Sequence, residues 1–168
     1  MRPLVLALAL LTPAVAAADE PVVERGKDST ITGHVDVAVA PEAAYALVVD
    51  PVAVARIDGS IEVSATPDGV CQDLDILIDH PLAKARYTTR SCPEGELVVR
   101  QWLTGGDAMK EYETRWRVEA LETGSRLHYR IRTIPAMAVP QAIVDRLTVK
   151  GARRLLERLR DHLEGEGS

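Results

Sequence analysis

Four histidines are the side chains best suited to exchange protons near neutral pH, and their positions do not assemble a catalytic site. His34 and His128 fall on the polar faces of alternating segments, His80 lies in a turn, and His162 is close to the C-terminus. Isolated histidines on polar faces are usually solvated. We therefore interpret all four as surface residues.

Other patterns that carry chemistry are also missing from the sequence. It contains no cluster with metal-ligand spacing, no glycine-rich phosphate loop and no nucleophile motif. We therefore expect no catalytic residue, no metal and no cofactor, and the sequence favours a binding protein over an enzyme.

Aromatic side chains with a polar edge can line an apolar cavity and orient one polar head group inside it. Thr89 and Thr114 could add hydrogen bonds there. Ordinary core packing is the alternative interpretation for each aromatic residue. The candidates for lining a cavity, one methionine included, are Tyr45, Tyr87, Trp102, Tyr112, Trp116, Tyr129 and Met137.

Cys71 and Cys92 are the only cysteines in the sequence. Residues 70–78 and 83–92 have the composition of two strands, with a turn signal at residues 80–82. An antiparallel hairpin centred on that turn places the two cysteines directly opposite each other. We predict a disulfide there, because an even cysteine count in an oxidising compartment suggests a bridge.

The same hairpin register gives each face of the two strands a consistent character. One face becomes polar and charge-matched, while the other becomes largely apolar, as a half-buried sheet requires. The disulfide would lie on the polar, solvent-facing side. The predicted pairs are Asp73 with Arg90, Asp75 with Thr88, Leu74 with Thr89, Ile76 with Tyr87 and Ile78 with Ala85.

The N-terminus has the three parts of a secretory signal. Residues 1–3 include a positive charge, residues 4–11 are uniformly apolar, and residues 16–18 are the small alanines that a signal peptidase needs. A membrane anchor is the alternative, but a span takes roughly 20 apolar residues and this run is shorter and meets Pro13. We predict cleavage near Ala18, or two residues earlier, and a periplasmic or secreted protein.

The remaining chain is expected to be one domain. Residues 19–28 are polar and predict a loose, flexible arm, residues 29–164 form the domain, and residues 165–168 form a tail. The formal net charge of −5 does not suggest nucleic acid binding. We expect a monomer.

Alternating and amphipathic segments predict an α+β order of elements. A first strand is followed by two short helices, further strands and one long helix. The expected strands cover residues 30–39, 60–66, 70–78, 83–92, 97–103, 110–121 and 126–134, and the helices follow Ala40, cover 52–57 and cover 140–163.

The long helix carries one apolar stripe on an otherwise charged surface. Gly151 interrupts it at a cost of about 1 kcal/mol relative to alanine. Either a tight helix–sheet contact or space for a ligand could explain this glycine. The predicted stripe consists of Val144, Leu147, Gly151, Leu155, Leu159 and Leu163, with Leu156 beside it.

Arginines gather on the polar faces of the last two strands. Glutamates share those faces, so a solvated mixed-charge surface is our interpretation. Transient contact with anionic membrane headgroups is the alternative. The arginines are Arg115, Arg117, Arg126, Arg130 and Arg132.

Several of these segments together resemble the START-like (SRPBCC) superfamily, which includes polyketide cyclase/dehydrase and coenzyme Q-binding relatives. Residues 35–51 contain a strand ending in Ala-Pro-Glu, the aromatic Tyr45 and a closing Asp-Pro. Residues 112–121 resemble the "Tyr…Trp-x-Val-x-x-Leu" strand of that superfamily, and residues 134–140 with the following helix also match.

The resemblance implies a helix-grip fold, in which a curved antiparallel sheet of about seven strands wraps the C-terminal helix, with two short helices after the first strand. It also implies a cavity between sheet and helix that binds a hydrophobic small molecule or a lipid. We expect the entrance near residues 134–140, the proline-bounded loop that leads into the long helix. A cyclase/dehydratase enzyme and a structural domain without ligand are the alternatives, because the fold alone does not choose among them.

Overall fold

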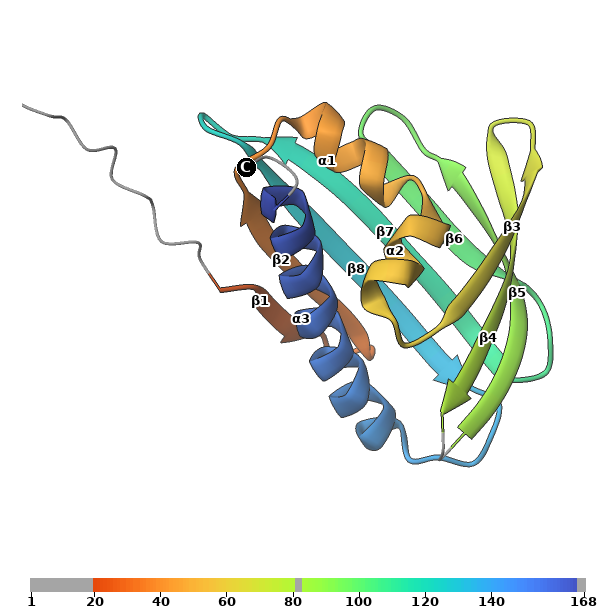
Figure 1. The fold of residues 1–168 in the computed structure, drawn as a ribbon. Helices are drawn as coiled ribbons and strands as arrows, with labels where there is room; N and C mark the ends of the chain where they lie inside the picture. Colours follow the sequence, from red (N-terminus) through yellow and green to blue (C-terminus); the bar gives the residue numbers. More distant parts are fainter. Residues whose placement is uncertain (1–19, 81–82, 166–168) are drawn as a thin grey trace, which may run out of the picture.

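Eight strands form one antiparallel sheet in the computed structural model, which describes residues 20–80 and 83–165 (Figure 1). The strands are arranged in the order β1-β2-β8-β7-β6-β5-β4-β3. The α+β helix-grip architecture is confirmed, with one strand more than predicted. The strands are β1 (Val22–Arg25), β2 (Thr30–Val37), β3 (Glu62–Asp68), β4 (Cys71–His80), β5 (Ala83–Pro93), β6 (Val98–Gly105), β7 (Met109–Ala120) and β8 (Ser125–Pro135).

Two short helices, α1 (Pro41–Val48) and α2 (Pro51–Asp58), link β2 to β3, and α3 (Gln141–Gly165) follows β8. The Asp50 carboxylate begins α2 by accepting hydrogen bonds from two backbone amides of its first turn, at 3.0 and 3.1 Å. Gly59 ends α2 in the left-handed region, with φ of 65°. No helix in the described ranges is long and apolar enough to cross a membrane.

The additional strand, β1, lies in the segment expected to be a loose arm, and that expectation is wrong for residues 22–25. β1 pairs antiparallel with β2, and Val23 lies opposite Gly33. Val23 also packs against the main core, and Arg25 forms an ion pair with Asp145 of α3 at 2.6 Å. Its pairing partner β2 follows directly at Thr30, so β1 belongs to a local hairpin that the polar composition of the segment did not reveal. As a result, the short helices follow the second strand and not the first.

The predicted hairpin register of β4 and β5 is confirmed. Cys71 and Cys92 are joined by a disulfide, with their Cα atoms 4.3 Å apart. His80 was expected in the turn and is instead the last residue of β4, paired with Ala83, while residues 81–82 lie outside the described residues. The observed pairs include Asp73 with Arg90, Leu74 with Thr89, Asp75 with Thr88, Ile76 with Tyr87 and Ile78 with Ala85.

The face of α3 that packs on the sheet differs from the predicted stripe. Asp145 and Ala152 belong to the buried face, together with three leucines of the C-terminal half. Leu147 was expected to be buried and is 63% exposed. The predicted stripe followed the leucines, whereas the helix is oriented by its small residue Ala152 and its buried acid. The buried leucines are Leu156, Leu159 and Leu163.

The tight helix–sheet contact occurs at Gly33 of β2 and not at Gly151 of α3. A Cβ atom on Gly33 would lie 2.9 Å from Leu156 Cδ1 and 3.0 Å from the Val22 carbonyl oxygen. A Cβ atom on Gly151 would meet no atom within 4 Å. The first of the two explanations for Gly151 is therefore wrong, and open space adjoins this part of α3.

We expect the Cys71→Ser, Cys92→Ser double variant to remain folded and to lose about 3 kcal/mol or less of unfolding free energy. The bridge closes a loop with a sequence separation of 21 and constrains mainly the unfolded chain. Urea unfolding of the oxidised, reduced and double-variant proteins measures this. Equal midpoints for the oxidised and reduced proteins would contradict it.

Replacing Gly33 and Gly151 by alanine should have opposite effects on the stability of the protein. Gly33→Ala should destabilise the protein by about 1–3 kcal/mol, because the added methyl overpacks the contact with Leu156. Gly151→Ala should stabilise it by up to about 1 kcal/mol through helix propensity. Thermal unfolding of both variants tests the pair, and destabilisation by Gly151→Ala would show that the space beside α3 is filled.

Candidate functional site

The inner face of the sheet, which we define as the face that contacts α3, carries two separate apolar clusters. The larger one lies beneath α1 and α3 and includes Trp116 and Leu127. The smaller one is built on β4 and β5 around Leu74, Ile76 and Tyr87. α3 packs chiefly on β2, with fewer contacts to β1 and β8, so it does not cover the smaller cluster. Figure 1 shows α3 beside β1 and β2, away from the β4–β5 hairpin.

Polar side chains occupy the inner face between these clusters. Gln101 Nε2 donates a hydrogen bond to Thr89 Oγ1 at 2.8 Å, and Thr114 Oγ1 donates to Gln101 Oε1 at 3.4 Å. The rings of Tyr87 and Tyr112 are 5.3 Å apart between centroids, and the Tyr112 hydroxyl interacts with Tyr87 and Thr114. We call these five residues of β5, β6 and β7 the tyrosine–glutamine cluster, and its two tyrosines also belong to the smaller apolar cluster.

The tyrosines of this region are held in their neutral form. Burial raises the pKa of Tyr112 to about 12, and burial likewise raises the pKa of Tyr87 and Tyr129 well above 10. The Asp58 carboxylate adds to the rise in the pKa of Tyr112 and Tyr129. Near neutral pH these hydroxyls can therefore donate and accept hydrogen bonds, but they do not supply a phenolate base.

Asp58 is a buried acid that the sequence analysis did not identify as a site residue. It ends α2, accepts a hydrogen bond from Ser60 Oγ and lies 3.6 Å from Arg154 Nη2 of α3. Arg158 of α3 donates to its backbone carbonyl. Asp58 therefore joins α2 to α3 beside the tyrosines. Its sequence signal was only that of a helix end, Asp-Gly.

Four of the predicted aromatic residues lie together on the inner face. Tyr87 and Tyr112 belong to the tyrosine–glutamine cluster, and Trp116 and Tyr129 stack with ring centroids 4.2 Å apart. Tyr45 of α1 is partly buried against the larger apolar cluster. Alternation along β7 and β8 was therefore a reliable guide to which side chains face inwards.

The other two predicted residues lie elsewhere. Trp102 is on the outer face, opposite Arg90 and Glu113, and the Arg100 guanidinium lies 5.6 Å from its ring centroid. The neighbours Gln101 and Leu103 occupy the inner positions of β6 instead. Met137 is 48% exposed in the loop between β8 and α3.

A metal centre does not form in the part of the chain that the structure describes. No three histidine, cysteine, aspartate or glutamate side chains come together there as ligands. His34 and His128 lie on the outer face as predicted, although both are half-buried. Around the tyrosine–glutamine cluster, the chemistry of the inner face is that of neutral hydrogen bonding between apolar surfaces.

Solved structures with a similar fold are found at low sequence identity. A START superfamily protein from Mycobacterium smegmatis is 19% identical, with a TM-score of 0.71, covering 82% of this chain and 98% of that chain. A STAR-related lipid transfer protein from Xanthomonas axonopodis is 15% identical, with a TM-score of 0.70, covering 85% and 92%. The Zhui aromatase/cyclase from Streptomyces sp. R1128 is 14% identical, with a TM-score of 0.69, covering 83% and 95%.

No protein-family model matches the sequence, and no curated protein sequence matches it. At these identities the structural likeness shows the fold alone. The chain has a START-like helix-grip fold, and its function must be argued from its own residues.

The buried tyrosines predict a loss of stability at alkaline pH. The folded protein keeps the Tyr112 proton up to about pH 12, while the unfolded chain releases it near 10. Unfolding free energy should therefore be unaffected below pH 10 and fall above it, by about 1.4 kcal/mol per pH unit for each such tyrosine. Urea unfolding at pH values from 9 to 12 measures this slope, which is the change in unfolding free energy per pH unit.

Tyr112→Phe should make that slope shallower, because it removes one of the tyrosines that resist ionisation. Tyr45→Phe, on α1 and outside the tyrosine–glutamine cluster, is the matched control. Identical slopes for Tyr112→Phe and the unsubstituted protein would contradict the neutral state that we assign to Tyr112.

Proposed function

We propose that this protein is exported and binds a hydrophobic small molecule or lipid between the inner face of the sheet and α3. One observation carries the proposal: a neutral, hydrogen-bonding cluster lies on the inner face between two apolar clusters that α3 does not join. Apolar parts of a ligand would gain roughly 25 cal/mol per Å² on burial, before ordering costs. An uncharged hydroxyl or carbonyl would then pair with Gln101 or Tyr112.

The residues on one side of α3 support the proposed entry of a ligand along this helix. Gly151 lies on the same side of the helix as Arg154 and Arg158, which contact α2. Towards the N-terminal end of α3, this flank continues through Leu147 and Ile143, whose apolar side chains are exposed. We define this row as the open flank of α3.

The loop before α3 adds exposed apolar surface to this end of the molecule. Met137 and Val139 are both exposed there. Isolated exposed apolar residues are ordinary, whereas several at one end of a helix indicate a binding or access surface. We propose that ligands enter between this loop, residues 134–140, and the open flank of α3.

Export is supported by the disulfide, which is compatible with an oxidising compartment. The signal sequence that we read in residues 1–18 lies outside the described residues. A periplasmic or secreted monomer remains our proposal for the mature protein.

An enzyme of the cyclase/dehydratase kind is the second candidate. The observation in its favour is that two tyrosines, two threonines and one glutamine converge on the inner face. The raised pKa of Tyr112 and Tyr87 keeps both hydroxyls protonated, so they can donate hydrogen bonds, but it makes them weak acids and leaves no phenolate to act as a base. A bound molecule released chemically unchanged after long incubation would favour simple binding.

Native mass spectrometry of protein isolated from its own host tests the proposed binding. We expect a copurified neutral or weakly polar molecule, and an increase in melting temperature when it or a related lipid or quinone is added back. Protein that is always free of ligand and shows no thermal shift with any such compound would favour a structural domain.

Gly151→Phe should abolish binding, because its side chain would enter the open space beside α3. The matched control is Arg153→Phe, which places the same ring on an exposed position of the same helix. Fluorescence or calorimetric titration with the copurified molecule compares the two. Equal affinities would show that the ligand does not use this space.

Tyr112→Phe should raise the dissociation constant by about two- to tenfold, since it removes one neutral hydrogen bond to the ligand. The same titration measures this, and unchanged unfolding midpoints would show that the fold is retained. An unaltered affinity would exclude the tyrosine–glutamine cluster as the site of the polar head group.

A further inference from the structure

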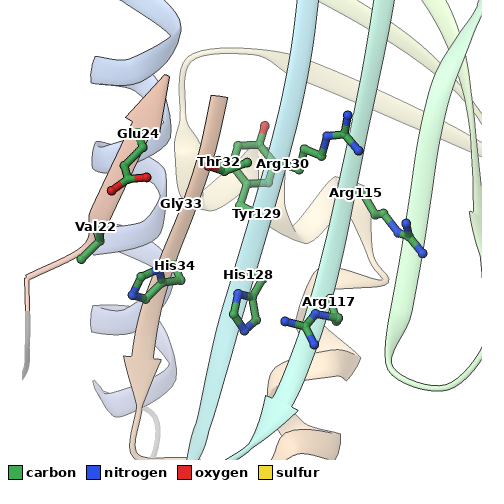
Figure 2. Close-up of a pocket in the computed structure, with 10 residues that line it drawn as sticks. All are labelled: Val22, Glu24, Thr32, Gly33, His34, Arg115, Arg117, His128, Tyr129 and Arg130. Atoms are coloured by element: carbon green, nitrogen blue, oxygen red, sulfur yellow. The ribbon is translucent and has the colours of Figure 1, made fainter. Parts of the chain in front are cut away.

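A hollow of about 440 Å³ lies on the outer face of the sheet, opposite α3 (Figure 2). It extends across β1, β2, β8 and β7, so it is distinct from the site proposed on the inner face. Cationic or titratable side chains line most of it. The lining side chains that can carry a positive charge are those of His34, Arg115, Arg117, His128 and Arg130.

Strand register places these side chains on two neighbouring rungs of the sheet. On one rung, Arg130 lies directly opposite Arg115 and, on its other side, opposite Thr32. On the next rung, His128 lies opposite Arg117 and His34. Figure 2 shows His34, His128 and Arg117 in one row across three strands, with Arg130 and Arg115 in the other.

This arrangement is unfavourable for the sheet by itself, because like charges placed directly opposite on neighbouring strands are destabilising. Arg115 and Arg130 form such a pair. The rings of His34 and His128 face each other with centroids 5.9 Å apart, so protonation of both would add to the repulsion. A bound anion would reverse the sign of these interactions.

Arg130 differs from the other arginines on the outer face of β5 to β8. Among the described residues, each of the others has a carboxylate partner within ion-pair distance, whereas no such partner is found for Arg130. The paired arginines are Arg86, Arg90, Arg100, Arg115, Arg117, Arg126 and Arg132.

Existing ion pairs hold the walls of the hollow in place around Arg130. Glu94 binds Arg115 at 3.0 Å, and Glu119 lies 3.4 Å from Arg117 and 2.6 Å from His128 Nε2. Each carboxylate holds one side of its cationic partner in place. The remaining N–H groups of the two guanidinium groups stay available to a ligand. Glu24 of β1 is the one carboxylate that lines the hollow itself, and three guanidinium groups outweigh it.

We propose that this hollow binds a phosphate group, with Arg130 as its principal ligand and with Arg115, Arg117 and the two imidazoles around it. A guanidinium matches the geometry of phosphate oxygens and can bind two of them at once. The phosphate could be that of a small soluble molecule or of a lipid headgroup, since both present the same chemistry. Either source would bring its group to the face of the protein opposite the proposed hydrophobic ligand.

Titration of the full mature protein with inorganic phosphate, followed by NMR of the histidine rings, tests the proposal. We expect saturable chemical-shift changes in the ring signals of His34 and His128. The ring signals of His162, which lies in the last turn of α3, serve as an internal reference. Arg130→Gln should weaken phosphate binding about tenfold or more, as loss of a charged hydrogen-bonding partner does. Arg132→Gln is the matched control, because Arg132 lies on the same face but outside the hollow and is paired with Glu111.

Vesicles distinguish the two sources of phosphate. Binding to vesicles that contain phosphatidic acid, but not to pure phosphatidylcholine, with the same loss in Arg130→Gln, would support a lipid headgroup. Phosphate binding without any vesicle binding would support a soluble ligand. Arg130→Lys, which keeps the charge, provides a second variant and should bind with intermediate affinity. Absence of saturable changes, or equal affinities for Arg130→Gln and Arg132→Gln, would overturn the proposal.

Discussion

The contact between α3 and the β1–β2 edge of the sheet is the interaction on which the rest of the structure depends. Gly33 lets Leu156 approach the strand backbone closely, and Ala152 keeps the helix near the sheet. Asp145 then anchors the N-terminal half of α3: it is almost fully buried and binds Arg25 at 2.6 Å and the Ser29 hydroxyl at 3.0 Å. Because a buried carboxylate is costly without partners, this anchor fixes the helix against β1 and β2.

The position of α3 determines which parts of the inner face are covered. The helix completes the larger apolar cluster, while the smaller cluster on β4 and β5 is left to pack with β3 and residues of β6 and β7. Thr89, Gln101 and Thr114 of the tyrosine–glutamine cluster lie between them, where neither apolar cluster supplies a continuous apolar surface. Polar groups in such a place must satisfy one another or a ligand, which is why Gln101 spans from Thr89 to Thr114.

The two faces of the sheet carry different kinds of side chains. Inward side chains of the central strands are neutral and largely apolar, and the tyrosine hydroxyls among them keep their protons because of burial. At the edge of the sheet, Arg25 of β1 forms an ion pair with Asp145. Most outward side chains form ion pairs across neighbouring strands. For example, Arg126 of β8 binds Asp36 of β2 at 2.5 Å. The disulfide belongs to this outer side and ties β4 to β5 at the end remote from residues 81–82.

Local pattern in the sequence determined the features that depend on neighbouring residues. Alternation located the long strands, and the hairpin centred on the predicted turn gave the β4–β5 register, which places Cys71 opposite Cys92 and Asp73 opposite Arg90. Alternation also placed Tyr112 and Trp116 inwards. Features that depend on distant partners were decided only by the tertiary structure. The contact of β1 with α3 required Asp145, the buried face of α3 required Gly33, and Asp58 acquired a place beside the tyrosines only when α2 packed against α3. The absence of a carboxylate beside Arg130 among the described residues likewise depends on how neighbouring strands meet, which no single segment encodes.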